Sequence, residues 1–289
     1  MRNRWSLVAA VLAVLTVILL ATGIFSTQKK QSLQDQLADE RQLAQQIENL
    51  SSVAISDTQA KKSLDEMLNQ QKSQLPDAAF TDVEAHASDG LSSGITDAIS
   101  SATDISVNSS DASARALATD FTAQWLDFAD TQKLNGFSAS QALVSVKDAA
   151  SNATCPAEEK NAEDQQTAEG TDSLTALVQS LDAAGYLASV TNARADVENT
   201  DSALAQRIES QGQEAQNISE NLRTSTECAV APIAQLPGYD LSNDSPSASF
   251  DSLETRIHDN ALAFLGDEKF SGENFRSARA NAVLAATEF

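Results

Sequence analysis

Residues 250–264 read FDSLETRIHDNALAF, and the spacing of their apolar side chains decides the fold class. An α-helix places the apolar residues of this stretch on one face, because they recur at steps of three or four: Phe250, Leu253, Ile257, Ala261 and Phe264. No segment of the chain alternates apolar and polar residues convincingly over the length of a strand. The sequence therefore predicts an all-α fold.

The same helical spacing recurs on both sides of this segment. It predicts three more helices, with apolar faces formed by Leu174, Leu177, Leu181, Ala184 and Ala188, by Leu204, Ile208, Ala215, Ile218 and Leu222, and by Phe275, Ala278, Ala282 and Phe289. A long proline-containing connection, residues 230–249, separates the second helix from the third. Short, long and short connections between four helices are typical of a bundle with one crossover, the connectivity of ferritin-like folds.

The region before this bundle also favours helices. The polar, leucine-containing segment from Gln31 to Leu50 is interpreted as a stalk helix that continues from a membrane segment. Three further helices are expected at residues 57–74, 114–128 and 138–150. The helix at 114–128 carries Phe121 and Trp125 on an apolar stripe, which is typical of a core.

Residues 88–110 are rich in Ser, Asp and Gly and are interpreted as a loop or a weak helix. Just before them, Thr81 and Glu84 have the spacing of a capping box, in which two side chains three residues apart accept hydrogen bonds from the first amides of a helix. A helix is therefore expected to begin near residue 81.

The two cysteines of the chain, Cys155 and Cys228, flank the first predicted hairpin of the bundle. If the two helices between them are antiparallel, the start of one lies beside the end of the other, within reach of a disulfide. Such a bond would close a long loop and contribute roughly 4 kcal/mol by chain-entropy reasoning. We predict a Cys155–Cys228 disulfide, with two unrelated buried thiols as the alternative.

The first 30 residues predict a membrane segment. No charged residue occurs from Trp5 to Gln28, and the apolar run LVAAVLAVLTVILLATGIF at residues 7–25 is long enough, at about 1.5 Å per residue, to cross the hydrocarbon core of a bilayer. Lys29 and Lys30 follow at the far face. We predict a signal anchor inserted through residues 5–27, and a cleaved secretory signal that leaves a secreted chain is the alternative.

Charge excludes one class of partner. The chain has 19 Lys and Arg against 41 Asp and Glu, a net charge of -22. Because nucleic acids are held by clustered basic residues, no nucleic-acid partner is expected. The acidic body is expected outside the cytoplasm, where the cysteines can oxidise, and a cytoplasmic body is the alternative. Its many acidic residues are interpreted as a solvated surface.

Four short motifs in the last part of the chain resemble a known family. They are Asp182-Ala183-Ala184-Gly185-Tyr186, the crossover Leu236-Pro237-Gly238-Tyr239, the helical Leu253-Glu254-Thr255-Arg256, and the Ala-rich end from Asn281 to Phe289. Over about residues 171–289 the chain is similar to the ferritin-like four-helix domain of unknown function found in exported and membrane-anchored actinobacterial proteins. The resemblance implies a ferritin-like four-helix bundle.

The sequence departs from a ferritin-like metal site. Such a site needs inward carboxylates from facing helices and Glu-x-x-His motifs on two of them. The chain contains no Glu-x-x-His, and Leu181 stands where an acidic ligand is expected. The nearest substitute is Glu254 with His258, four residues apart on one helix face. No metal or other cofactor is predicted, and Glu254 and His258 are the candidates should a metal bind.

Residues 90–94, GLSSG, match the Gly-x-Ser-x-Gly pattern of a hydrolase nucleophile elbow. That mechanism requires a buried strand before the serine, and an acid and a histidine after it. The segment 81–89 is polar and unlike a strand, and His86 precedes the serine. No catalytic residue and no cofactor-binding residue is predicted, and the protein is expected not to be an enzyme.

These observations predict three parts: a signal anchor at residues 1–30, a membrane-proximal helical region at 31–154, and a disulfide-stapled four-helix bundle at 155–289. The expected function is that of a non-enzymatic cell-envelope interaction or structural module, with a protein or another envelope component as its partner. A ferritin-like metal-binding or redox protein is the alternative. A ligand-sensing domain with apolar pockets between Ala-rich helices is a third hypothesis.

Overall fold

The computed structural model describes residues 36–86, 88–151, 173–198, 202–226 and 246–289, and every regular element within them is a helix. The first helix covers residues 36–51, and the others are α2 (Thr58–Gln74), α3 (Leu91–Asn108), α4 (Ala112–Thr131), α5 (Ala139–Ala142), α6 (Val144–Ser151), α7 (Ser173–Glu198), α8 (Ser202–Thr226), α9 (Pro246–Leu265) and α10 (Arg276–Glu288). Short 3-10 turns lie at Asp77–Phe80, Glu268–Phe270 and Glu273–Phe275. The all-α prediction is confirmed.

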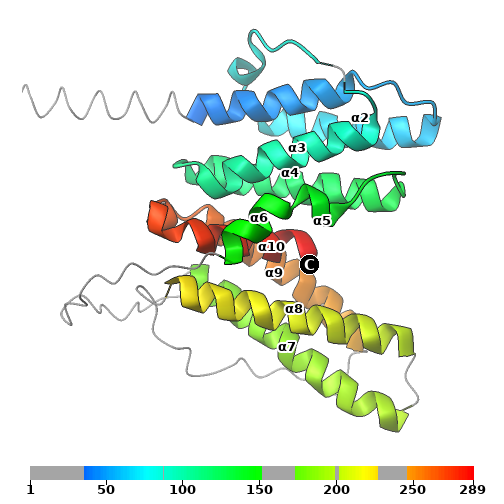
Figure 1. The fold of residues 1–289 in the computed structure, drawn as a ribbon, viewed down its shortest axis with the longest axis vertical. Coiled ribbons are helices and arrows are strands. Elements are labelled where there is room, and N and C mark those ends of the chain that lie inside the picture. Colours follow the sequence, from blue (N-terminus) through cyan, green and yellow to red (C-terminus); the bar gives the residue numbers. More distant parts are fainter. Residues whose placement is uncertain (1–35, 87, 152–172, 199–201, 227–245) are drawn as a thin grey trace, which may run out of the picture.

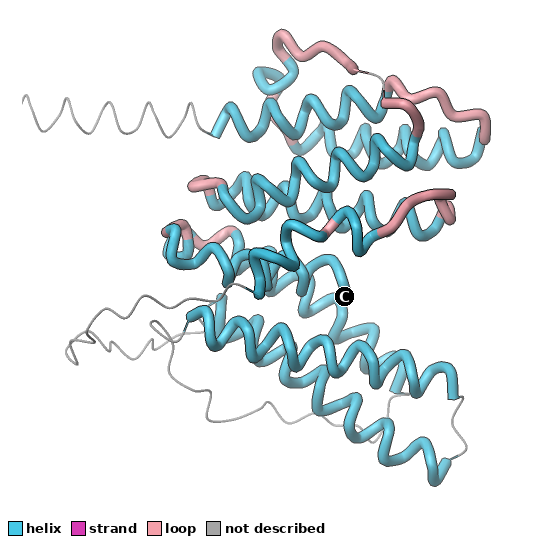
Figure 2. Tube along the Cα trace, in the orientation of Figure 1, coloured by secondary structure: helices cyan, strands magenta, loops and turns pink. Residues whose placement is uncertain are grey.

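The helices stack into an elongated body, shown in Figure 1. The helix over residues 36–51 and α2 lie at one end, α3 and α4 follow, α9 and α10 lie in the middle, and α7 and α8 form the other end (Figures 1 and 2). One cluster of buried apolar side chains runs through this stack, from Leu43 in the first helix to Leu222 in α8. The two ends are therefore joined by a continuous core.

The helix α10 lies at the centre of this core. Every residue from Ser277 to Ala286 is buried. The helix packs against α3, α4 and α6 from the first half of the chain and against α8 and α9 from the second half. We expected a single buried face, but side chains as small as alanine allow neighbouring helices to approach α10 from several sides. The boundary between residues 154 and 155 stays a prediction, and α10 joins the helices on both sides of it.

The four last helices contact one another in a ring. The helix α7 packs against α8 and α9, and α10 packs against the same two helices. The apolar faces predicted for the first three are buried, at Leu174, Leu177, Leu181, Ala184 and Ala188 in α7, Ile208, Ala215, Ile218 and Leu222 in α8, and Phe250, Leu253, Ile257, Ala261 and Phe264 in α9. Those predicted helices and their inward faces are therefore confirmed for these residues.

The helix α3 corrects the interpretation of residues 88–110 as a loop or a weak helix. It has a fully buried stripe made of Ile95, Ala98, Ile99 and Ala102. Its hydroxyl groups bond to carbonyls within the helix, as from Thr96 Oγ1 to Ser92 at 2.9 Å and from Ser106 Oγ to Ala102 at 3.0 Å. Burial against α4 and α10 therefore outweighs the modest helix propensity of serine and threonine.

Two smaller expectations in this region were wrong. No helix begins near residue 81: Asp82 has a left-handed backbone with φ of 63°, and α3 starts only after Gly90. The helix over residues 36–51 is part of the body and not a free stalk, because Leu43, Ile47 and Leu50 are buried. Helices α2 and α4 instead begin at Asp57 and Asp111, whose carboxylates accept hydrogen bonds from first-turn amides.

Two sequence predictions concern other parts of the chain. The predicted anchor at residues 1–30 and both cysteines of the predicted disulfide, Cys155 and Cys228, lie outside the described residues. Among the helices that are described, none is long and apolar enough to cross a bilayer.

Candidate functional site

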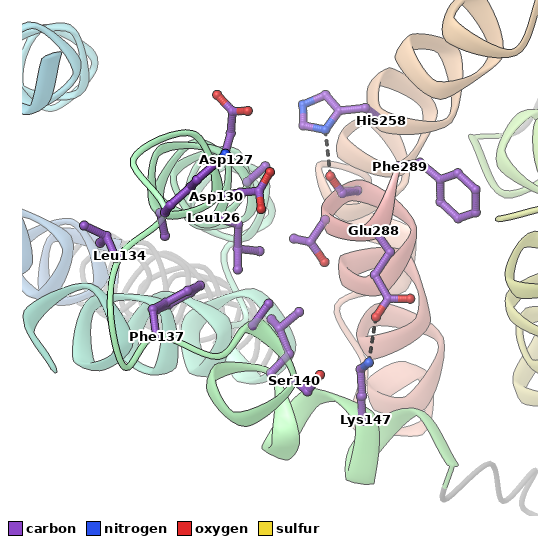
Figure 3. A pocket seen from close by; sticks show the side chains of 17 residues that line it. Leu126, Asp127, Asp130, Leu134, Phe137, Ser140, Lys147, His258, Glu288 and Phe289 are labelled. Carbon is purple, nitrogen blue, oxygen red and sulfur yellow. Dashed lines mark hydrogen bonds and ion pairs between the residues drawn. The ribbon is translucent and has the colours of Figure 1, made fainter. Parts of the chain in front are cut away.

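A cavity of about 720 Å³ opens between α4, α6, α9 and the last turn of α10 (Figure 3). Small-molecule sites commonly have volumes of about 300–1,000 Å³. Its larger apolar lining residues are Leu126, Leu134, Phe137, Leu143 and Phe289. Its charged lining residues are Asp127, Asp130, Lys133, Lys147, His258 and Glu288. The cavity thus combines apolar surface with groups of both charges.

The turn after α4 shapes one wall of this cavity. The backbone N–H of Leu134 donates to the carbonyl of Ala129 at 3.1 Å, and that of Lys133 donates to Asp130 at 3.0 Å, which together make a Schellman motif. Lys133 takes the left-handed position that glycine usually fills, with φ of 48°. This turn leads Leu134 and Phe137 back onto the core.

His258 connects three helices beside the cavity. From α9, its Nδ1 lies 2.9 Å from the carbonyl oxygen of Ala286 in α10 (Figure 3), and its Nε2 lies 3.7 Å from Oδ1 of Asp120 in α4. Both neighbours are acceptors, so only the doubly protonated imidazolium can donate from both nitrogens. The interaction with Asp120 raises the pKa of His258 from its ordinary value of 6.5, burial opposes it, and the Ala286 carbonyl adds to the increase.

A second group of charges lies at the same end of α10. The Nζ of Lys147 in α6 is 2.7 Å from Oε1 of Glu288 in α10. Burial, followed by the neighbouring Glu288, raises the pKa of Glu214 in α8, while Lys147 acts in the opposite direction. The last turn of α10 is therefore surrounded by ionisable side chains from α6, α8 and α9.

The two candidate metal ligands, Glu254 and His258, are not brought to one site. The Oε1 of Glu254 accepts a hydrogen bond from Nε2 of Gln211 in α8 at 2.8 Å, whereas His258 faces α4 and α10. They share a helix face by spacing, but their side chains contact different neighbours. In the part of the chain that the structure describes, no group of three His, Cys, Asp or Glu is placed to hold a metal ion.

The GLSSG segment has the wrong context for a nucleophile elbow. Ser92 lies in the first turn of α3, and no strand precedes it within residues 81–86 and 88–90. The hydroxyl of Ser93 donates to the carbonyl of Gly90 at 2.9 Å. His86 is exposed, and its backbone N–H donates to Asn49 at 2.8 Å. These residues act in the local structure of the α3 start.

Two arginines that the sequence analysis did not single out are almost completely buried: Arg115 in α4 has 0% exposure and Arg279 in α10 has 1%. Arg115 donates at 3.0–3.1 Å to the carbonyls of Ser109, Leu265 and Asp267 and to the hydroxyl of Ser271. Arg279 donates at 2.7 Å to the carbonyls of Val107, Phe270 and Gly272. The two guanidinium groups therefore join α4 and α10 to the ends of α3 and α9.

The position of these guanidinium groups has an electrostatic reason. The carbonyls at the C-terminal end of a helix have no partner inside it, and the helix dipole makes that end negative. Burial first, and the neighbouring Arg115 second, lower the pKa of Arg279 to about 10. The group stays charged at neutral pH, and carbonyl dipoles take the place of an acidic partner.

Sequence reasoning missed these contacts because they join distant parts of the chain. Arg115 and Arg279 reach residues more than a hundred positions away, and so does Asp120 in facing His258. The available signal was a charged residue inside an alanine-rich helix: Arg115 follows Ala114, and Arg279 lies between Ala278 and Ala280. Such a residue is either exposed or held by many hydrogen bonds, and spacing alone does not separate the two cases.

The fold and the site define an all-helical protein in which the helices of both halves of the chain pack around one core. Comparison with known proteins adds no family to this class: no protein-family model matches the chain, and no significant match was found among curated proteins or solved structures.

Proposed function

We propose that the protein is a single-pass, membrane-anchored module whose extracytoplasmic helical body binds a partner and does not catalyse a reaction. The observation that carries this proposal is the use of ionisable groups at the cavity. Both ring nitrogens of His258 face acceptors, on Asp120 and Ala286, and Lys147 is paired with Glu288. These pairings connect α4, α6, α9 and α10, which supports a structural use of His258, Lys147 and Glu288.

The membrane address rests on the sequence. The uncharged run at residues 7–25 has the length of a bilayer span, and the body behind it is strongly acidic. The cavity, with apolar and charged lining side by side, supports binding as the role of the body. The proposed partner is a protein or another envelope component.

A ferritin-like four-helix bundle at residues 155–289 is part of the proposal. It is supported by the ring of contacts in which α7 and α10 each pack against α8 and α9. A disulfide between Cys155 and Cys228 would staple the open end of the α7–α8 hairpin. Peptide mapping without reductant is expected to find these two cysteines linked, and two free thiols would contradict this part.

Membrane anchoring is tested on the full chain in its natural host. The wild-type chain is expected to stay with membranes after alkaline carbonate extraction and to keep residues before Lys29 at its N-terminus. The double substitution Leu15→Arg with Leu19→Arg should release the chain from membranes, because each charge at the centre of a membrane helix costs about 2.5–3.5 kcal/mol. Leu15→Ile with Leu19→Ile is the matched control. A soluble chain that starts close after Gly23 would identify a cleaved signal instead.

Metal analysis separates the proposed role from the ferritin-like metal-binding alternative. The purified full chain is expected to carry no stoichiometric iron, manganese or zinc after growth in metal-supplemented medium. Bound metal that is lost in both Glu254→Gln and His258→Ala would overturn the binding-module proposal. Metal lost in neither variant would indicate adsorption to the acidic surface.

A further inference from the structure

We propose that His258, Asp120 and Ala286 form a proton-operated contact, which we call the His258 bridge, that holds the second half of α4 against α9 and α10 along one wall of the cavity. When the imidazole is protonated the wall is closed, and when it loses its proton as the pH rises the wall loosens. This device does not depend on the proposed membrane anchor or partner.

The first step is the attachment of α4. Near the start of the helix, Arg115 donates to Leu265 and Asp267 at the end of α9, and its guanidinium stays charged across ordinary pH. Further along, Asp120 meets His258. Beyond that point, Asp127 and Asp130 line the cavity, and Figure 3 shows both on the side of α4 that faces α9 and α10. One end of α4 is thus fixed independently of pH, and the proton-dependent contact lies between it and the cavity.

The second step is the chemistry of the ring. A neutral imidazole carries one N–H and one lone pair. If Nδ1 keeps the proton, the contact with Ala286 survives but the lone pair of Nε2 points at the carboxylate of Asp120. If Nε2 keeps it, the lone pair of Nδ1 points at the carbonyl. Either tautomer replaces one attraction by a repulsion, so deprotonation weakens the bridge whichever nitrogen retains the proton.

The third step is the set of surrounding charges. From α4 the ring meets Asp120, with Asp127 nearby in the cavity lining, and on its own helix it has Asp259 next to it and Glu254 one turn away. At the end of α10, Glu288 is neutralised by Lys147 from α6. In α7, which also packs against α9, Asp182 is bonded to Arg223 and Ser219 of α8. Asp130 and Lys133 line the same cavity, with one charge of each sign. The two charges that act on the ring, Asp120 and Asp259, are anionic and favour the imidazolium.

The sign and the pH window follow from this balance. The pKa of His258 is raised in the folded protein, so its contribution is complete below the ordinary value of 6.5 and is lost as pH rises through the raised value. The raised pKa of Glu214 also contributes stability at low pH that is lost as the pH rises. This loss begins lower, because the ordinary pKa of Glu214 is 4.5. A change in hydrogen exchange between about pH 6 and about pH 9 therefore reports mainly the loss of the proton from His258.

The test is amide hydrogen exchange of the purified full chain at these two pH values, corrected for the intrinsic exchange rate. In the wild type, exchange in residues 121–137 is expected to be faster at the higher pH. In His258→Gln it should be fast at both, and in Asp120→Asn the pH-dependent difference should shrink. Asp65→Asn, which makes the same change of charge on α2 and outside the cavity lining, is the matched control and should behave as the wild type.

A direct readout of the proton keeps the proposal decidable if His258→Gln fails to fold. The chain has two histidines, so His86→Gln leaves a single imidazole signal for NMR titration. Asp120→Asn is expected to move the titration midpoint of that signal to lower pH. An unchanged midpoint, or a wild-type exchange pattern that does not change with pH, would overturn the proposal.

Discussion

Arg279 donates three hydrogen bonds to backbone carbonyls from inside the core, at Val107, Phe270 and Gly272. A single side chain therefore closes the end of α3 and the turn that leads into α10. Because the guanidinium presents five donors in a fixed plane, it can reach several carbonyls that a shorter or single-point donor would leave unpaired.

Replacement of Arg279→Ala is expected to lower the free energy of unfolding by about 3 kcal/mol or more, since each buried carbonyl left without a partner costs about 1–3 kcal/mol. Arg276→Ala, three residues earlier and exposed, is the control and should change stability by less than about 0.5 kcal/mol. Denaturant unfolding followed by circular dichroism measures both. Equal effects of the two substitutions would show that the carbonyl contacts of Arg279 contribute little.

At the scale of the element, two glycines lie in the contact between α7 and α8, and only one of them is needed for it. A Cβ at Gly212 would lie 2.1 Å from the Cβ of Ala188, where two helix surfaces meet. A Cβ at Gly185 would instead meet the side chain of Gln216, at 2.5 Å from its Cγ. The first neighbour is fixed to a helix backbone, whereas the second is an exposed side chain that can rotate away.

We therefore expect opposite results from the same chemical change. Gly212→Ala should destabilise the protein by about 1–3 kcal/mol, because the helices must separate. Gly185→Ala should be neutral or stabilising by up to about 1 kcal/mol, because alanine has the higher helix propensity. Thermal unfolding of the two variants beside the wild type decides this. A stabilised Gly212→Ala would mean that α7 and α8 are further apart than described.

The helices with long apolar side chains were the ones that sequence reasoning located correctly. Leu177, Leu181 and Ile257 mark inward faces at helical spacing, and the structure buries them. The helix α3 was interpreted as a loop or a weak helix, because its Ser, Asp and Gly residues are typical of loops, although Ile95 and Ile99 lie on its buried face. The environment of α10 was missed for another reason: Ala282 is equally compatible with a surface and a core. Small side chains thus leave the burial of a helix undecided.

The site shows the same limit. His258 was a candidate from its spacing to Glu254, yet its actual partners, Asp120 and Ala286, come from α4 and α10. Spacing within one helix predicts which side chains share a face. It carries no information on which helix lies opposite, and the partner of a polar side chain in a bundle is usually there. The cavity itself arises where four helices meet, and no local pattern predicts it.

At the scale of the whole molecule, the central position of α10 predicts a single unfolding transition. Its contacts with α3, α4 and α6 on one side and α8 and α9 on the other couple the two halves of the chain. Trp125 reports on the first half, and in a Trp5→Phe background it is the one tryptophan left. Its fluorescence and the circular dichroism of all helices should therefore change at the same denaturant concentration.

Leu284→Ala in α10 should move both signals together, with a loss of about 2–5 kcal/mol. Leu68→Ala in α2 removes a buried leucine far from α10 in the stack, and it is the control that shows what the same change does away from the central helix. Two separate transitions would favour independent domains at the predicted boundary near residue 154.

The order of synthesis gives the central helix a further consequence. Residues 276–288 leave the ribosome after all the helices that surround them, so a growing chain has no means to fill the space between its two halves. Until those residues emerge, the apolar surfaces of α3, α4, α6, α8 and α9 that pack against α10 stay unburied and open to chaperones. For a body that lies outside the cytoplasm, as proposed, this delay means that export acts on a chain whose core is not yet complete.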